Sequence, residues 1–292
     1  MNLEGRVALV TGAGGGLGRA HALLLARHGA KVLVNDLGDG AAAVAAEIEA
    51  VGGEALAVSC SVTDEAEVAA MVAAAKARWG RIDILVNNAG VLRDASFAKM
   101  SIADFRLVVD VHLMGAAICT KAVWDTMRAQ NYGRIVMTTS SSGLYGNFGQ
   151  ANYGAAKMAL VGLMQTLSIE GAKNDIRVNC LAPTAATAMT DGLLPPEMKA
   201  LLQPERVSPG LVALVGEDAP TRAILMAGAG HFERAYVTIT PGIYVGDGDD
   251  AAAEVAAKWA AVSDRTGESV PETGAVQIHQ ELTAAAKANS LS

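Results

Sequence analysis

Tyr153 and Lys157 lie four residues apart at the start of an expected helix, so their side chains project from one face. A tyrosine exchanges a proton with an alcohol near neutral pH only if its pKa of about 10 is lowered by roughly 3 units. A nearby ammonium group favours the phenolate and supplies part of that shift. Ser140, at the end of the preceding expected strand, is placed to hydrogen-bond the substrate oxygen. The pair alone also fits an ordinary amphipathic helix, but with Ser140 it predicts proton transfer at an alcohol.

A glycine-rich segment, TGAGGGLG at residues 11–18, follows the first expected strand and opens the first expected helix. Glycines let the backbone turn tightly and approach a pyrophosphate, and the helix N-terminus offers unpaired N–H groups to the anion. A flexible turn is the alternative, but the position between strand and helix favours a dinucleotide site. The residues expected to bind it are Gly12, Gly14, Gly16, Leu17 and Gly18.

Asp36 closes the second expected strand. A carboxylate there accepts hydrogen bonds from the adenosine ribose hydroxyls and repels a 2′-phosphate, so NAD is favoured over NADP as the cofactor. The glycine segment contains no lysine or arginine to pair with that phosphate, which agrees with this choice. The alternative is that Asp36 only caps a helix or shapes a turn.

Short β-branched runs alternate with long Ala/Leu-rich stretches of helical period. The expected strands are 7–11, 31–35, 55–59, 82–87, 134–139, 176–181 and 223–227. The expected helices are 17–28, 41–51, 65–79, 102–128 and 153–171. This alternation predicts an α/β protein with a Rossmann-type doubly wound parallel sheet and helices on both faces.

The last third of the chain is less regular. Four prolines between residues 193 and 210 predict an irregular loop with short helical pieces, which is either a lid over the site or an ordinary surface connection. Two Ala-rich stretches, 251–262 and 275–289, predict helices after a polar break. We therefore expect a catalytic domain at 1–246 and a C-terminal helical extension at 247–292 that packs on the main domain or on a second subunit.

Composition excludes several classes of function. The formal net charge of -7 leaves no basic stripe for nucleic acid, and no cationic run marks a membrane-surface anchor. The three cysteines form no CxxC pair, which predicts neither a zinc or other metal site nor a disulfide framework. No signal peptide, membrane-spanning run or usual C-terminal peroxisomal address is evident, so a soluble, cytoplasmic protein is expected.

The glycine segment, NNAG at 87–90, the serine and YGAAK at 153–157 stand in one order, and over residues 5–245 the chain resembles the short-chain dehydrogenase/reductase family. The resemblance implies hydride transfer at the nicotinamide C4 while Tyr153 handles the alcohol proton. It also implies that Tyr153 and Lys157 contact the cofactor. The other cofactor-binding residues that it implies are Ser61, Val62, Asn88, Ala89, Gly90, Pro183 and Thr187.

Two positions depart from the family pattern. His112 stands where most members carry a catalytic asparagine, so the usual proton relay is modified, although histidine can also donate and accept hydrogen bonds. A purely structural histidine is the alternative. Thr184 replaces a common glycine after Pro183, which changes the expected path of the loop over the nicotinamide.

Four longer features, VNDLG at 34–38, residues 87–101, His112 and residues 145–157, resemble the (3R)-hydroxyacyl-CoA dehydrogenase part of peroxisomal multifunctional enzyme type 2. This implies oxidation of a (3R)-3-hydroxyacyl-CoA, with a fatty or steroid side chain, by a homodimer or homotetramer. Leu144, Phe148 and Met189 are candidate pocket walls. Candidate cations for the CoA phosphates are Arg93, Lys99 and Arg106.

Three other functions stay open. A hydroxysteroid dehydrogenase acting on free steroid alcohols shares the chemistry, and a 3-oxoacyl-carrier-protein reductase shares several of the motifs. Asp36 and the extended tail argue against the reductase, because such enzymes usually use NADPH and end sooner. A catalytically silent NAD-binding regulator belongs to a different class, and the presence of Ser140, Tyr153 and Lys157 argues against it.

Overall fold

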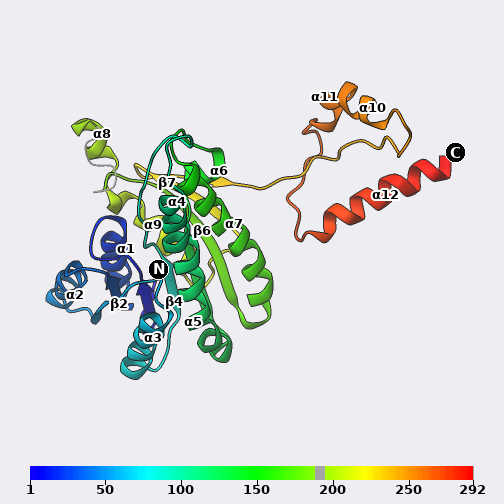
Figure 1. Ribbon diagram of the computed structural model, residues 1–292. Helices are drawn as coiled ribbons and strands as arrows, with labels where there is room; N and C mark the ends of the chain where they lie inside the picture. Colours follow the sequence, from blue (N-terminus) through cyan, green and yellow to red (C-terminus); the bar gives the residue numbers. More distant parts are fainter. Residues whose placement is uncertain (188–194, 292) are drawn as a thin grey trace. The chain divides into compact units, whose positions relative to one another are not determined.

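The computed structural model describes residues 1–187 and 195–291 (Figure 1). Its contacts divide the chain into two compact units, Met1–Arg234 and Ala235–Ser292. The first unit holds the sheet and the surrounding helices, and the second holds the C-terminal helices.

An eight-stranded sheet forms the centre of the first unit, in the order β3-β2-β1-β4-β5-β6-β7-β8. Adjacent strands from β3 through β7 pair in parallel. The strands are β1 Val7–Val10, β2 Lys31–Asp36, β3 Ala55–Ser59, β4 Ile84–Asn87, β5 Gly133–Thr138, β6 Ile176–Thr184, β7 Ile224–Gly228 and β8 His231–Ala235. The order reverses between β1 and β4, and in such sheets a ligand binds at the carboxyl ends of the strands beside that point.

Helices cover both faces of the sheet, which confirms the predicted doubly wound fold (Figure 1). Helix α1 contacts both α2 and α9, α3 contacts α5, and α4 contacts α7. Their bounds are α1 Gly16–Arg27, α2 Gly40–Ala50, α3 Glu65–Trp79, α4 Ile102–Val109, α5 Gly115–Gln130, α6 Ser141–Tyr145, α7 Ala151–Gly171, α8 Pro196–Leu201 and α9 Ser208–Val215. The strands between them are short and apolar, and β1 and β4 are buried along their whole length.

The single helix expected at 102–128 is instead three consecutive segments. A π-helical segment, η1 Asp110–Met114, separates α4 from α5 and carries His112 at its centre. Short π-helical segments often lie at functional sites. Hydrophobic periodicity did not reveal the segment, because one widened turn barely shifts a helical pattern.

The short helical pieces expected between residues 193 and 210 are present in the part that the structure describes, and three of the prolines lie in their first turns. Pro196, Pro204 and Pro209 lie at the first positions of α8, a 3-10 turn at Pro204–Arg206 and α9. Proline is favoured there because its fixed φ suits a helix and its missing N–H would have no partner. Helix α9 packs in the core through buried apolar residues. Residues 193 and 194 lie outside the described residues, and the lid stays a prediction.

Strand β8 was absent from the sequence prediction. Ala229 and Gly230 both have positive φ, as a two-residue hairpin turn requires, and they connect β7 to β8. All but the last residue of β8 are exposed, and the strand carries Glu233 and Arg234. A charged edge strand resists unwanted pairing with other chains, and for the same reason it lacks the apolar pattern by which strands are recognised.

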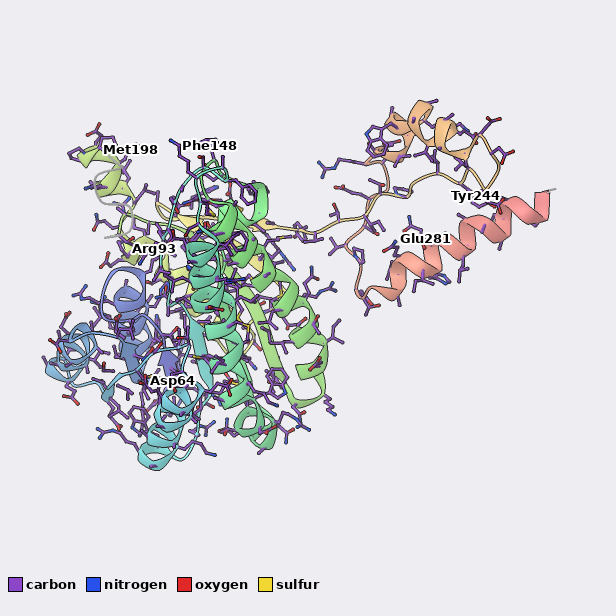
Figure 2. All side chains as sticks on the ribbon, in the orientation of Figure 1. Asp64, Arg93, Phe148, Met198, Tyr244 and Glu281 are labelled. Carbon is purple, nitrogen blue, oxygen red and sulfur yellow. The ribbon has the colours of Figure 1, made fainter. Side chains whose placement is uncertain are left out.

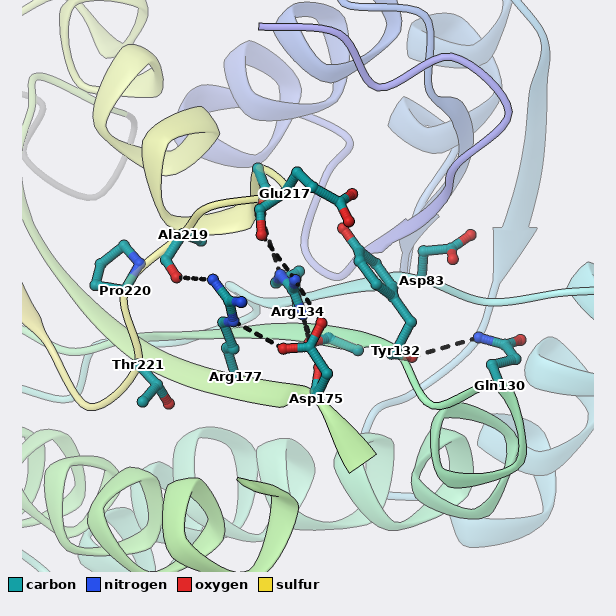
Figure 3. A network of polar contacts seen from close by, with 12 residues as sticks. Asp83, Gln130, Tyr132, Arg134, Asp175, Arg177, Glu217, Ala219, Pro220 and Thr221 are labelled. Atoms are coloured by element: carbon teal, nitrogen blue, oxygen red, sulfur yellow. Dashed lines mark hydrogen bonds and ion pairs between the residues drawn. The ribbon is translucent and has the colours of Figure 1, made fainter. Parts of the chain in front are cut away.

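A buried arginine organises the amino ends of β5 and β6, opposite the ends where a ligand is expected (Figure 3). Arg134 is fully buried and donates to the carbonyl oxygens of Asp175 at 2.7 Å and Gly216 at 3.1 Å. Its guanidinium forms an ion pair with the Asp175 carboxylate at 2.9 Å. Tyr132 lies against the guanidinium groups of Arg6 and Arg134. Because this buried charge is paired and hydrogen-bonded, we assign the network a structural role.

A second buried polar pair joins α1 to α9. His21 Nδ1 lies 2.8 Å from Ser208 Oγ, while His21 Nε2 has no partner among the described residues. Burial lowers the pKa of His21 to about 3. The folded protein therefore holds a neutral imidazole at a pH where an unfolded histidine binds a proton.

His21→Gln is expected to reduce the acid sensitivity of folding. The wild type loses stability as the pH falls below 6.5 toward about 3, by up to about 1.4 kcal/mol per pH unit for each excluded proton. The glutamine variant lacks this pH-dependent loss of stability at residue 21, although buried His112 still causes a loss of its own. Thermal unfolding from pH 7 to pH 4 measures the change, with His279→Gln on exposed α12 as the control. An unchanged pH dependence in His21→Gln would contradict the prediction.

The second unit contains α10 Ala251–Ala257, α11 Trp259–Val262 and α12 Ala275–Leu291, as the helical tail predicted. It begins at Ala235, earlier than the expected start at residue 247. The reason is that the chain before residue 247 contacts the tail. Ile239 bridges to Ser269, and Gln280 donates to the carbonyl oxygens of Thr240 at 2.9 Å and Pro241 at 2.8 Å. None of the unit's residues that the structure describes is buried.

Candidate active site

A pocket of about 590 Å³ is lined by residues from the carboxyl ends of β1 to β6 or from the loops after these strands. Every residue predicted to be catalytic or to bind the cofactor lines it except Gly14. The residues expected to be catalytic that line it are Ser140, Tyr153, Lys157 and His112. Those expected to bind the cofactor are Gly12, Gly16, Leu17, Gly18, Asp36, Ser61, Val62, Asn88, Ala89, Gly90, Pro183 and Thr187.

The glycine segment forms a close-packed turn at the start of α1. A Cβ on Gly18 would lie 2.2 Å from the Gly12 carbonyl oxygen, and a Cβ on Gly12 would lie 2.7 Å from Ala89 Cα, so neither position tolerates a side chain. Gly15 is the N-cap of α1 and no side chain caps this helix end. By contrast, Asp64 caps α3 (labelled in Figure 2). A helix N-terminus left uncapped at a glycine turn suits a bound phosphate.

Asp36 closes this end of the pocket. Its carboxylate accepts the Gly14 N–H at 2.8 Å and the Leu37 N–H at 2.8 Å. Gly14 therefore lies behind Asp36 and supports the carboxylate without lining the pocket. The N-cap of α2 is Asp39, so Asp36 does not cap that helix. Carboxylate oxygens accept several hydrogen bonds, so Asp36 retains capacity for ribose hydroxyls.

Asn88 fixes the glycine turn from the neighbouring strand. Its side-chain Nδ2 donates to the carbonyl oxygens of Thr11 and Gly12, both at 3.0 Å. The Thr11 hydroxyl in turn accepts the N–H groups of Asn88 at 3.0 Å and Ala89 at 3.1 Å. The sequence placed Asn88 at the cofactor without indicating that its side chain supports the turn, and it did not single out Thr11.

Tyr153 and Ser140 meet at the other end of the pocket. Ser140 is the N-cap of α6 and is 8% exposed, and Tyr153 is half-buried near the start of α7. Burial raises the pKa of Tyr153 above its ordinary value, a hydrogen bond with Ser140 lowers it, and the Asp94 carboxylate raises it. The protein without ligands therefore favours the neutral phenol, so the phenolate needs positive charge nearby.

Lys157 lies beneath Tyr153 in the protein interior. Its ammonium donates to the Thr138 carbonyl at 2.5 Å and lies 5.4 Å from the centroid of the Tyr153 ring. Burial lowers the pKa of Lys157 to about 7. Small changes in its surroundings therefore change its charge at neutral pH, which suits a group that exchanges protons.

His112 belongs to the π-helical segment η1 and is buried against the loop that follows β4. Its Nε2 lies 2.8 Å from the Val91 carbonyl oxygen and 3.1 Å from the Val91 nitrogen, and its ring meets Tyr153 edge-on with centroids 5.2 Å apart. Burial and the nearby Lys157 lower the pKa of His112 to about 3, so the ring is neutral. A Cβ on Gly90 would lie 2.3 Å from the imidazole, which explains the glycine.

His112 Nδ1 has no hydrogen-bond partner among the described residues, and neither does Asn87 Oδ1. Both residues line a small cavity that also includes Lys157. Unpartnered buried polar atoms are costly and need an explanation. Here His112 Nδ1 and Asn87 Oδ1 are available to form hydrogen bonds in the small cavity that Lys157 also lines.

The pocket also contains polar residues to which the sequence assigned no role, and Asp94, Asn147 and Gln150 are three of them. Gln150 Nε2 donates to the Asp94 carboxylate at 2.7 Å, and Asn147 Nδ2 donates to Gln150 Oε1 at 3.2 Å. These residues lie within the longer stretches used for the resemblance, but no spacing rule connects positions so far apart in the chain.

Several weaker expectations are not met by the geometry. Leu144 does not line the pocket, and Phe148 is 90% exposed and also lies outside its lining (Figure 2). Met189 lies outside the described residues. The candidate cations Arg93, Lys99 and Arg106 are exposed and do not line the pocket.

In the parts of the chain that the structure describes, no helix is both long and apolar enough to cross a membrane. Within the same residues, no group of three His, Cys, Asp or Glu side chains is arranged to hold a metal ion.

Comparison with known proteins identifies similar chains. The family model for short chain dehydrogenase matches residues 6–197. Peroxisomal multifunctional enzyme type 2 of Drosophila melanogaster is 52% identical over 228 residues, which cover 75% of this chain and 38% of that protein. A short-chain type dehydrogenase/reductase of Mycobacterium tuberculosis is 45% identical over 92% of this chain and 97% of its own length.

Solved structures give a consistent result. The full-length Drosophila enzyme matches with a TM-score of 0.84 and 38% identity, over 98% of this chain and 50% of that one. A 7α-hydroxysteroid dehydrogenase complexed with NADH and a 7-oxo bile acid matches with a TM-score of 0.73 and 30% identity, over 78% of this chain and 95% of that one. This chain thus spans about half or less of the length of the multifunctional enzyme.

Proposed function

Because the chain belongs to the short-chain dehydrogenase/reductase family and is an oxidoreductase, we propose that it oxidises (3R)-3-hydroxyacyl-CoA esters to 3-oxoacyl-CoA esters with NAD. The observation that carries the proposal is the convergence of Ser140, Tyr153 and Lys157 on one pocket that also contains the glycine turn and Asp36. A relative from Saccharomyces cerevisiae, 46% identical over 80% of this chain, is named peroxisomal hydratase-dehydrogenase-epimerase. That name supports the proposal, because a hydratase produces a hydroxyl group that a dehydrogenase can oxidise.

The residues at the glycine end of the pocket fit a dinucleotide. The uncapped N-terminus of α1 would hold the pyrophosphate, and Asp36 would hold the adenosine ribose. Ser61, Val62, Pro183 and Thr187 line the same pocket and would contact the remainder. NAD, when bound, supplies the acceptor for the hydride that leaves C3 of the substrate.

Tyr153 accepts the proton of the substrate hydroxyl, and Ser140 hydrogen-bonds the same oxygen. Burial opposes the phenolate, so the lysine ammonium and a positively charged nicotinamide must both favour it. Lys157, with a pKa of about 7, can return the proton toward solvent. In this proposal His112 holds Val91 in place and offers Nδ1 to a hydrogen-bonded relay on the lysine side.

The substrate is tested by comparing kcat/KM for matched alcohols with NAD. We expect (3R)-3-hydroxybutyryl-CoA to be oxidised at least about tenfold more efficiently than free hydroxysteroids, because remote contacts to CoA help to position the hydroxyl. The (3S) ester is the stereochemical control, and the pantetheine ester isolates the contribution of the nucleotide phosphates. A preference for free steroid alcohols would favour a hydroxysteroid dehydrogenase, which the similarity to the 7α-hydroxysteroid enzyme makes the second candidate.

Preference for the (3S) ester would overturn the assignment of the stereochemistry. Efficient reduction of 3-oxoacyl-carrier protein with NADPH would instead favour the carrier-protein reductase, whose similarity covers 65% of this chain. Cofactor binding without oxidation of any alcohol would favour a silent regulator. The cytoplasmic location and the homodimeric or homotetrameric assembly stay predictions, and several relatives carry names that place them in peroxisomes.

A further inference from the structure

Asp94 carries a negative charge at the pocket end that holds Ser140 and Tyr153, called here the substrate end. It follows β4 and lines the pocket together with Tyr153, and its carboxylate raises the pKa of that hydroxyl. The only hydrogen bond that the described residues give its side chain comes from Gln150 Nε2 to Oδ2, at 2.7 Å. Arg93, the neighbouring cation, has its Nε 3.7 Å from Asp104 instead.

The loop that carries Asp94 is held firmly against the catalytic helix. Asn152 is fully buried and donates to the Arg93 carbonyl at 3.0 Å, and the Ala95 N–H donates to the Gly149 carbonyl at 2.9 Å. With the Gln150 contact, three hydrogen bonds fix the loop on both sides of Asp94. Asp94 is exposed to solvent, and these hydrogen bonds hold its carboxylate at the pocket.

Little positive charge compensates Asp94. Among the described residues that line the pocket, the charged side chains are Asp36, Asp94 and Lys157, with His112 neutral. The Lys157 ammonium is buried and donates to the Thr138 carbonyl. A substrate carboxylate at the substrate end would therefore lie near Asp94, and the described residues that line the pocket offer it no exposed cation.

We propose that Asp94 is a specificity-determining residue that disfavours hydroxy acids with a free carboxylate and thereby selects substrates in which C1 is a neutral thioester or ester. The inference rests on the proposed function, because it assigns the C3 hydroxyl to Ser140 and Tyr153. Two carbon–carbon bonds then separate C3 from C1, so a C1 carboxylate cannot leave the vicinity of this pocket end. The negative charge of a C1 carboxylate would be repelled by the Asp94 carboxylate. A neutral carbonyl is compatible with the amide groups of Asn147 and Gln150.

Asp94→Asn removes the charge and keeps an oxygen that can accept the Gln150 N–H. We measure kcat/KM with saturating NAD for free (3R)-3-hydroxybutyrate and for its N-acetylcysteamine thioester. The ratio of thioester to acid is expected to fall about tenfold or more in Asp94→Asn, equivalent to about 1.4 kcal/mol. Using a ratio within one variant cancels differences in the fraction of active protein.

Asp104→Asn is the matched control, because it removes the same charge next to Arg93 from a residue that does not line the pocket. Its ratio is expected to stay within about twofold of the wild type, because the Asp104 carboxylate lies outside the pocket lining and faces Arg93. Raising the salt concentration should shrink the difference between wild type and Asp94→Asn, since screening weakens the repulsion.

An inhibition experiment separates this inference from the proposed function. Butyrate and butyramide have nearly the same shape and differ in charge, and both are tested as competitors of any alcohol that the enzyme oxidises. We expect butyrate to bind more weakly than butyramide to the wild type and to gain affinity in Asp94→Asn. If no 3-hydroxyacyl ester is oxidised but this discrimination holds, the substrate assignment fails and the charge filter stands.

Two results would overturn the inference. An unchanged thioester-to-acid ratio together with unchanged discrimination between butyrate and butyramide would show that Asp94 does not act on a substrate carboxylate. A fall in thioester oxidation without any gain for the acid would show that Asp94 binds the substrate directly.

Discussion

Replacing Tyr153 by phenylalanine is expected to lower kcat by about 10²- to 10⁴-fold, the usual contribution of a positioned acid–base group. Phenylalanine preserves the ring that meets His112 edge-on at 5.2 Å and removes only the hydroxyl. The glycine turn and Asp36 lie at the other end of the pocket, so NAD affinity should change little. Steady-state kinetics and a titration of NAD binding measure the two quantities separately.

Tyr145→Phe provides a control with the same chemical change. Tyr145 is 69% exposed and does not line the pocket, and within the described residues its hydroxyl makes only a long contact with the Met226 sulfur, at 3.6 Å. We expect its turnover to match the wild type. Near-normal turnover in Tyr153→Phe would remove Tyr153 from the proton-transfer step and with it the proposed mechanism.

Substitution of Asp36 is expected to change the preference between the two nicotinamide cofactors. Asp36→Asn keeps an acceptor for the Gly14 N–H and removes the charge that repels a 2′-phosphate. The ratio of kcat/KM for NADP to that for NAD should rise about tenfold in Asp36→Asn, for one charge interaction near the surface. Asp36→Arg should raise it further, because arginine pairs with phosphate.

Asp39→Asn is the matched control for this series. Asp39 is the N-cap of α2, makes no side-chain capping bond and does not line the pocket, so its removal should leave the cofactor preference unchanged. Kinetics with both cofactors at matched substrate concentration provide the measurement. A wild-type enzyme that already prefers NADP would show that the interpretation of Asp36 is wrong.

Family membership and the doubly wound fold were predicted from the sequence and are confirmed. The reason is that both depend on local patterns. A glycine turn must directly follow a strand and open a helix, and YGAAK must lie on one helical face, so neighbouring residues reveal them. Buried parallel strands are continuous apolar runs, which is why β1 to β7 were found within a few residues of their observed bounds.

The local patterns failed where burial and long-range packing decide the conformation. Short helical pieces were expected among the prolines after residue 194, but the burial of α9 in the core was not, because that burial depends on residues far away in the sequence. The exposed edge strand β8 and the π-helical segment at His112 likewise have no periodic signature. The short tail was recognised as helical, but its first residue depends on contacts such as that of Ile239 with Ser269.

The sequence thus determined which residues could perform the chemistry, since their types and spacing define the glycine turn, Asp36, Ser140, Tyr153 and Lys157. Only the tertiary structure decided their electrostatic state. Burial, which no local pattern encodes, lowers the pKa of Lys157 to about 7 and raises that of Tyr153. The contact of Gln150 with Asp94 joins residues 56 positions apart, so the charge at the pocket's substrate end follows from folding and not from any motif.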